Sequence, residues 1–133
     1  MTPHRVLLIE DDPLEAALAK RTLRKINAAI EVVRLRDGAH FLEFYKKNRP
    51  VRGIHLAIMD LHMPRVDGFG VLKVLSDARE RAPFPIVMFS SSEDQEEIKR
   101  AKQLGASAFV NKPTAPRAYR AAMEDIVRSW LAV

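Results

Sequence analysis

Short apolar runs alternate along the chain with longer segments in which apolar residues recur every three or four positions. The short runs are rich in Val, Ile, Leu and Phe, which is typical of buried strands, and cover residues 5–10, 30–35, 54–60, 86–89 and 108–111. The longer segments have the spacing of amphipathic helices and cover about residues 13–27, 37–50, 68–79, 93–104 and 116–130. This alternation, with short loops and no linker or repeat, predicts one α/β domain over residues 1–133, with a parallel sheet covered by helices on both faces.

Individual residues indicate where these helices begin, end and face. Asp12 suits the N-cap and Pro13 the first turn of the first helix, while Gly105 suits a left-handed cap after the fourth. The expected inward faces carry Leu14, Ala17, Leu18, Thr22, Leu23 and Ile26 in the first helix, Val71, Leu72 and Leu75 in the third, and Tyr119, Met123, Ile126 and Trp130 in the last.

Composition narrows the class of protein without identifying it. The 133 residues are 47% apolar and 29% charged, as in an ordinary globular domain, and no apolar run approaches the length of a membrane helix. The N-terminus lacks a signal-peptide pattern, and the absence of cysteine excludes disulfides and thiolate metal sites. We therefore expect a cytoplasmic protein with no membrane contact.

The net charge of +5 raises the question of nucleic-acid binding. The basic residues are scattered, no run of Lys or Arg exceeds two, and no aromatic residues alternate with them to stack on bases. This pattern argues against direct nucleic-acid binding and favours a basic surface that attracts an acidic protein partner.

Reactive side chains follow four of the five predicted strands. Asp11 and Asp12 follow the first strand, Asp60 the third, Ser90 the fourth and Lys112 the fifth. Because ligands of open α/β sheets bind beyond the carboxyl ends of the strands, we expect these side chains to converge on one pocket.

Carboxylates so close together repel one another, by roughly 4 kcal/mol for two unit charges about 4 Å apart at an effective dielectric near 20. A Mg²⁺ ion would offset this repulsion, with carboxylates from Asp12 and Asp60, Asp11 acting through water, and a backbone carbonyl from the loop after Asp60. Lys112 and the Ser90 hydroxyl could each meet a phosphoryl oxygen, which leaves Asp60 as a nucleophile for an aspartyl-phosphate.

The chain resembles the receiver domains of response regulators over nearly its whole length. The matching segments are Leu8-Ile9-Glu10-Asp11-Asp12-Pro13, Met59-Asp60-Leu61-His62-Met63-Pro64-Arg65-Val66-Asp67-Gly68, Ile86-Val87-Met88-Phe89-Ser90-Ser91, Gly105-Ala106 and Phe109-Val110-Asn111-Lys112-Pro113. The resemblance implies a (βα)₅ flavodoxin-like fold with strand order 2-1-3-4-5. It also implies a signalling domain of a two-component phosphorelay, not an enzyme with an external substrate.

The same resemblance implies a role for each site residue. Asp60 accepts a phosphoryl group from the phosphohistidine of a sensor histidine kinase, and Mg²⁺ is bound by Asp11, Asp12, Asp60 and the backbone carbonyl of His62. Ser90 is the switch hydroxyl, Lys112 senses the phosphoryl group, Phe109 is the switch aromatic, and Lys112–Pro113 is often a cis bond. Phosphorylation then changes the surface formed by the fourth helix, fifth strand and fifth helix.

Three residues depart from the usual pattern of these domains. Phe109 stands where many members have Tyr, so a switch there would use ring packing without a hydroxyl group. Ser90 replaces the common Thr and keeps the donor. The side chain of His62 overhangs the pocket and could alter hydrolysis of the phosphoryl group, although an exposed loop histidine is the simpler interpretation.

A second resemblance concerns the partners. The serines at 90–92, Asn111-Lys112-Pro113 and the closing Ser129-Trp130-Leu131 resemble response regulators that pair with bacterial phytochrome histidine kinases. This implies a photoreceptor kinase as donor and, in many members, a homodimer. With no output domain expected after Val133, the output would be a protein–protein contact or a relay to a histidine phosphotransfer domain. Trp130 and Leu131 would serve either helix packing or a dimer contact.

Other interpretations of the site remain open from the sequence. Asp11 and Asp12 could be a helix cap and a solvated acid. A Mg²⁺-dependent phosphohydrolase could also use Asp60, but it would have a second acid where His62 stands and a segment that covers the substrate. A module that works without phosphate would have no need to keep Asp12, Asp60, Ser90 and Lys112 together.

Overall fold

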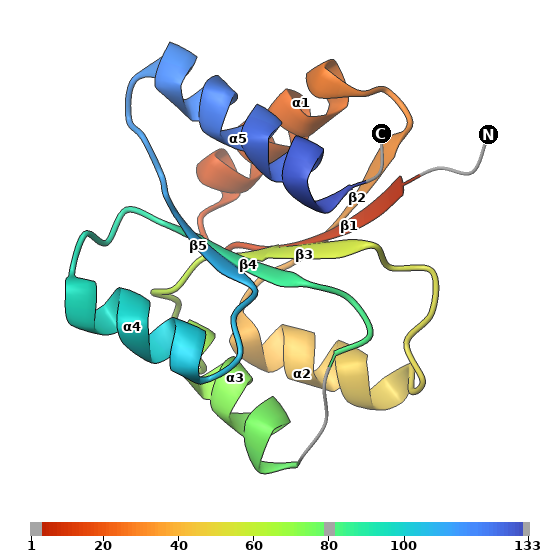
Figure 1. The fold of residues 1–133 in the computed structure, drawn as a ribbon. Helices are drawn as coiled ribbons and strands as arrows, with labels where there is room; N and C mark the ends of the chain where they lie inside the picture. The colour runs from red at the N-terminus through yellow and green to blue at the C-terminus, as the bar shows by residue number, and fades with distance from the viewer. Residues whose placement is uncertain (1–3, 79–81, 132–133) are drawn as a thin grey trace.

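The computed structural model describes residues 4–78 and 82–131. Within them, strands and helices alternate as predicted (Figure 1). Their bounds are β1 His4–Ile9, α1 Pro13–Ile26, β2 Ile30–Leu35, α2 Gly38–Lys47, β3 Leu56–Met59, α3 Gly68–Asp77, β4 Ile86–Ser90, α4 Gln95–Gln103, β5 Ala108–Asn111 and α5 Pro116–Trp130. None of the described helices is both long and apolar enough to cross a membrane.

The five strands form one parallel sheet in the order β2-β1-β3-β4-β5, which confirms the flavodoxin-like topology. Figure 1 shows α1 and α5 on one face of the sheet and α2, α3 and α4 on the other. The order of the strands reverses at β1 and β3, so the loops that leave these two central strands diverge and open a crevice at the carboxyl edge.

The core has two halves, one on each face of the sheet. In β3, Ala57 and Met59 belong to the half beneath α2, α3 and α4, whereas Leu56 and Ile58 belong to the half beneath α1 and α5. Because successive side chains of a strand point to opposite faces, a strand buried on both faces must be apolar throughout. This explains the uninterrupted apolar run before Asp60.

The predicted inward face of α1 is right for Thr22, Leu23 and Ile26 but wrong for Leu14, Ala17 and Leu18. Leu14 is 80% exposed and Leu18 38% exposed, while Ala16, Ala19 and Leu23 are buried. Nine residues separate Leu14 from Leu23, about two and a half helical turns, so the two leucines lie on opposite sides of the helix. The small side chains of the two alanines form the buried stripe with Leu23, and Leu14 is left in solvent.

The remaining boundary predictions differ from the structure by a few residues at most. The third strand begins at Leu56 instead of residue 54, and α3 ends at Asp77, so the expected end at residue 79 lies outside the described residues. Gly105 has the expected left-handed backbone, with φ 110°. The cis bond implied at Lys112–Pro113 is absent, and the described cis bond is Arg49–Pro50, because tertiary context and not the dipeptide decides which X–Pro bond is cis.

The end of α5 closes the half of the core beneath α1 and α5. Leu131 is buried there, and Trp130 is partly buried against the same cluster. Of the two roles considered for these residues, the structure therefore favours helix packing.

The start of α2 lies unusually close to the loop between β3 and α3. The Gly38 N–H donates to the Val66 carbonyl at 3.1 Å, and a Cβ on Gly38 would lie 2.2 Å from that oxygen. The requirement for glycine is therefore steric: any side chain would push the loop away from α2.

We expect Gly38→Ala to destabilise the protein by about 1–3 kcal/mol, because the new methyl group overlaps backbone that cannot rotate away. Gly70→Ala is the matched control, since its Cβ would contact the Val66 side chain instead of backbone. Urea unfolding of both variants tests this. Equal losses in the two variants would contradict the steric explanation.

Candidate functional site

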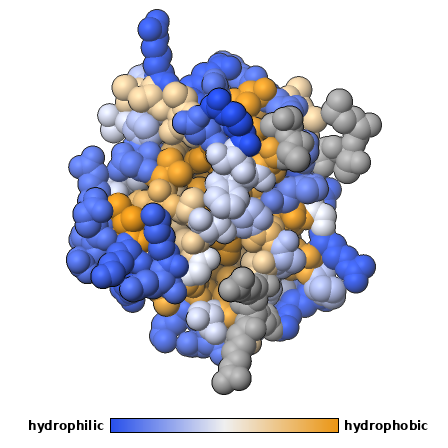
Figure 2. All heavy atoms as spheres, viewed as in Figure 1, coloured by the Kyte–Doolittle hydropathy of each residue, from blue (hydrophilic) through white to orange (hydrophobic). Residues whose placement is uncertain are grey.

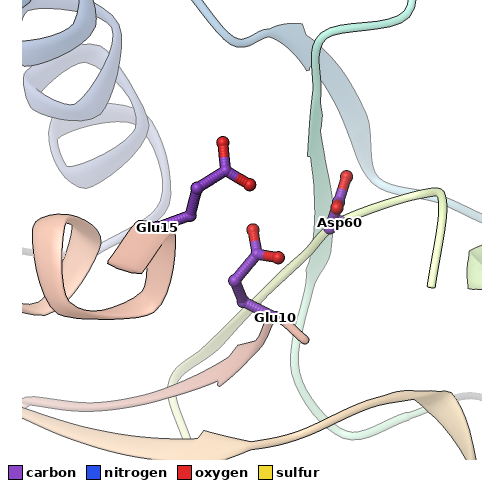
Figure 3. A group of neighbouring side chains, drawn as sticks. All are labelled: Glu10, Glu15 and Asp60. Carbon is purple, nitrogen blue, oxygen red and sulfur yellow. The ribbon is translucent and has the colours of Figure 1, made fainter. Parts of the chain in front are cut away.

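Three carboxylates meet at the carboxyl edge of the sheet (Figure 3). Glu10 directly follows β1, Asp60 directly follows β3, and Glu15 lies in the first turn of α1. One oxygen of each lies within 4.8 Å of the others, and Figure 3 shows the Glu10 and Glu15 carboxylates turned toward each other. Asp60 is therefore where the sequence predicted, but Glu10 and Glu15 were missed.

Lys112 extends from the end of β5 into this cluster. Its Nζ donates to Glu10 Oε1 at 3.0 Å and lies 3.6 Å from Glu15 Oε2, with only 11% of the side chain exposed. Burial lowers the pKa of Lys112, but the carboxylates of Asp60 and Glu10 raise it by more. The lysine is thus a mostly buried, charged ammonium group, and it joins the site through Glu10.

Glu10 is the buried carboxylate of the site. Only 3% of the residue is exposed, and its Oε2 accepts from the backbone N–H of Asp12 at 3.2 Å. Burial raises the pKa of Glu10 to about 7, since the opposing effect of Lys112 is smaller and Asp60 adds to the increase. Near neutral pH, Glu10 can therefore hold or release a proton beside Asp60.

Asp12 does not lie in the cluster where we had placed it. Its Oδ1 accepts from the N–H groups of Leu14 at 2.9 Å and Glu15 at 3.4 Å and so caps α1. This confirms the cap, which satisfies unpaired N–H groups of the first helical turn, and Asp12 lies outside the group of carboxylates that could share a cation. Asp11 is exposed, and its negative charge raises the pKa of Asp60. The role of Asp11 as a metal ligand stays a prediction.

Asp60 is only partly buried. Its Oδ1 accepts from the Leu61 N–H at 2.8 Å. Burial raises the pKa of Asp60, Lys112 lowers it, and Glu15 and Asp11 raise it, with a net increase. The carboxylate is therefore crowded by other acids and stands to gain from an added cation.

Ser90 and Phe109 lie on adjacent strands beside this pocket. Ser90 is the last residue of β4 and is 1% exposed, and its hydroxyl oxygen accepts from the Ser92 N–H at 3.3 Å. Phe109 is half-buried and packs against the half of the core beneath α4. Their positions suit a switch, and that role stays a prediction.

The side chain of His62 points toward α4. Its Nε2 lies 3.3 Å from Glu97 Oε1, the same oxygen that accepts from the Ser92 hydroxyl at 2.5 Å. One carboxylate on α4 thus joins the loop after Asp60 to the loop after Ser90. The carbonyl of His62 as a metal ligand stays a prediction.

The donor set fits a hard divalent cation. Glu10, Glu15 and Asp60 offer only carboxylate oxygens, in a partly buried position where their mutual repulsion is weakly screened. Mg²⁺ and Mn²⁺ favour such oxygen ligands.

Two solved structures have this fold. The Mn²⁺-bound form of response regulator Rcp1 matches 98% of this chain and 96% of its own, with TM-score 0.84 and 22% identity. The phosphorylated cyanobacterial phytochrome response regulator RcpA matches 98% of this chain and 95% of its own, with TM-score 0.86 and 22% identity.

Curated relatives are similar over most of this chain. The two-component response regulator ORR3 of Oryza sativa subsp. indica is 31% identical over 114 residues, covering 86% of this chain and 82% of that protein. The probable transcriptional regulator ycf27 of Porphyridium aerugineum is 27% identical over 128 residues. The match covers 96% of this chain but only 50% of the length of that regulator.

The raised pKa of Glu10 predicts a pH dependence. When the pKa of a carboxyl group is higher in the folded state than in the unfolded state, protonation of that group stabilises the fold. This contribution is complete at pH values below the unfolded-state pKa and is lost as the pH rises to the folded-state pKa. We therefore expect metal-free wild type to lose stability relative to Glu10→Gln between pH 4.5 and about 7. Urea unfolding at intervals across this range tests it, and a constant difference between the two proteins would contradict it.

The sequence pattern of the response regulator receiver domain matches residues 6–124, nearly the whole chain. Together with the parallel sheet and the acidic pocket opposite Lys112, this match settles the family. The chain belongs to the response regulator receiver domains.

Proposed function

We propose that Asp60 accepts a phosphoryl group from the phosphohistidine of a sensor histidine kinase in a reaction that requires Mg²⁺. The observation that carries this proposal is the partly buried Asp60 carboxylate, which lies among acids and near enough to the ammonium group of Lys112 for that charge to lower its pKa. Phosphoryl transfer depends mainly on positioning and on neutralising charge, and this arrangement supplies both.

Each side chain of the pocket has a distinct part in the transfer. A carboxylate oxygen of Asp60 bonds to phosphorus as the P–N bond of the phosphohistidine breaks, and the electron pair of that bond leaves with the imidazole nitrogen. Lys112 neutralises one phosphoryl oxygen, and the Ser90 hydroxyl donates to another. Hydrolysis by water later restores Asp60.

The residues that would hold Mg²⁺ are Asp60, Glu10 and Glu15, whose carboxylate oxygens lie together, with Asp11 and the carbonyl of His62 as further ligands. When bound, the ion supplies positive charge that offsets both the carboxylates and the incoming phosphoryl oxygens. Glu10 has a second role in this proposal, because its bond to Lys112 holds the ammonium group beside Asp60.

The exposed face of α1 supports a docking surface for the kinase. Leu14 and Leu18 are exposed on this helix, and Leu18 lines a groove of about 610 Å³ that also contains Lys112 and Pro113. Arg21 and Lys25 border the same groove, which favours an acidic partner. A kinase helix that covers the two leucines would bring its phosphohistidine to the mouth of the pocket.

The phytochrome class of kinase is the finer part of this proposal. Its supports are the likeness in fold to RcpA and Rcp1 and the sequence resemblance at residues 90–92 and 111–113. A phytochrome-type histidine kinase is therefore the first donor to test.

The output surface in this proposal comprises α4, β5 and α5. Figure 2 shows a band of hydrophobic and weakly polar residues across the middle of the face on which β5 lies, with hydrophilic residues around it. Movement of Ser90 toward the phosphoryl group would leave space into which Phe109 repacks, and so alter this surface. A downstream protein, a histidine phosphotransfer domain or a second copy of the chain would bind there.

We expect wild type to gain one phosphoryl group when incubated with a small-molecule phosphodonor and Mg²⁺. Asp60→Asn should gain none, because an amide does not attack phosphorus, and omission of Mg²⁺ should prevent the gain in wild type. Intact-mass analysis measures all three. A gain in both proteins, or in neither, would overturn the assignment of Asp60.

We expect Leu14→Ser with Leu18→Ser to slow transfer from a phosphorylated phytochrome-type kinase about tenfold, since loss of two apolar contacts costs on the order of 1.4 kcal/mol. Uptake from a small phosphodonor should be unchanged, because the pocket is intact. Val74→Ser, at a 47% exposed position on α3, is the matched control. Equal slowing with both donors would argue against a docking role.

A further inference from the structure

The loop of residues 61–66 carries the chain from Asp60 to α3, and an ion pair between Arg65, whose side chain is 60% exposed, and the buried carboxylate of Asp37 ties it to the start of α2. Arg65 Nε donates to Asp37 Oδ2 at 2.8 Å, and Arg65 Nη2 donates to Asp37 Oδ1 at 2.9 Å. Two parallel bonds of this kind fix the orientation of the guanidinium group as well as its distance. The loop is thereby held at one angle relative to α2.

Asp37 is itself firmly placed. It is 5% exposed, and its Oδ1 also accepts from the His40 N–H at 2.9 Å, which caps α2. Burial raises the pKa of Asp37, but the His40 N–H and the Arg65 guanidinium lower it by more, so the carboxylate is charged at neutral pH. Release of Arg65 would leave a buried charge without its partner, which is unfavourable.

The backbone on either side of this pair shows that the loop depends on it. Arg65 has a left-handed backbone, with φ 67°, which residues other than glycine rarely adopt. Such a conformation persists only where the surroundings enforce it. The next residue, Val66, accepts from the Gly38 N–H at 3.1 Å, so side-chain and backbone contacts hold the same two residues against α2.

The other polar attachment described for the middle of this loop is weaker. His62 makes a single contact to Glu97 at 3.3 Å, whereas Arg65 makes two shorter bonds, at 2.8 and 2.9 Å, to one buried carboxylate. Met63 and Val66 pack against the core, but apolar contacts are not directional and permit sliding. The Arg65–Asp37 pair is therefore the directional side-chain contact that orients this loop, in addition to the backbone bond from Gly38 to Val66.

We propose that Arg65 is a positioning residue of the phosphorylation site, and that through Asp37 it fixes the loop carrying the His62 carbonyl beside Asp60. This inference rests on the proposed function. A loop free to shift would place its carbonyl away from a cation bound at Asp60, and both cation affinity and the rate of phosphoryl transfer would fall.

The test compares four variants of the full chain with wild type. Arg65→Ala removes the pair, and Arg65→Lys keeps the charge without the two parallel bonds. Asp37→Asn keeps an acceptor for the cap on α2 and removes the carboxylate. Arg52→Ala, at an exposed arginine before β3, has the same change in net charge as Arg65→Ala and is the matched control.

Two measurements separate positioning from stability. Calorimetric titration gives the Mg²⁺ Kd of the unphosphorylated protein, and intact mass gives the rate of phosphoryl gain at saturating Mg²⁺ from a small phosphodonor. We expect Arg65→Ala to weaken Mg²⁺ binding and to slow the gain, each by about tenfold or more, since displacement of a reacting group by 1 Å can cost roughly 100-fold. Arg65→Lys and Asp37→Asn should fall between Arg65→Ala and wild type.

The other possible outcomes contradict either the positioning role of Arg65 or the proposed function itself. If the Arg65 and Asp37 variants lower Tm but match Arg52→Ala in Kd and rate, the pair is only structural and the inference fails. Should Arg65→Ala not fold, Arg65→Lys and Asp37→Asn decide by the same comparison. If wild type neither binds Mg²⁺ nor gains mass, the proposed function fails and takes the inference with it.

Discussion

The ion pair between Lys112 and Glu10 is the interaction on which the candidate site depends. It joins the end of β5 to the end of β1, residues 102 positions apart, across the edge of the sheet. Several carboxylates can gather there because a buried ammonium group offsets part of their charge. The sheet order makes this possible, since reversal at β1 and β3 opens the crevice that the lysine side chain crosses. The candidate site therefore depends on both the strand order and the ion pair.

Much of the fold could be predicted because local signals agreed with tertiary structure. The apolar run of β3 predicted a strand buried on both faces, and Asp12 with Pro13 predicted where α1 begins. The inward face of α1 could not be predicted in the same way. Leu14 and Leu18 looked like core residues by hydrophobicity, but the buried stripe uses alanines, which only the position of the helix on the sheet decides.

Some residues of the candidate site could likewise be predicted from local sequence, and others could not. Ser90 ends its strand, and Asp60 and Lys112 directly follow theirs, so the parallel sheet alone brings the three residues together. Glu10 and Asp12 are two residues apart at one strand end, and which of them turns inward depends on where the strand stops and the helix cap forms. The sequence had left both a helix cap and metal binding open for Asp12, and the structure shows the cap. The pair of Arg65 with Asp37 joins two loops 28 residues apart, and no local pattern indicates it.

The position of Trp130 has a practical consequence for spectroscopy of this protein. It is the chain's single tryptophan, and it is partly buried at the far end of α5 against the half of the core shared with α1. Its indole emission therefore senses the packing of these two helices and is separated from the acidic pocket by the length of α5. Any change in that emission when the pocket is loaded would be a direct optical record of rearrangement passing through the fifth helix.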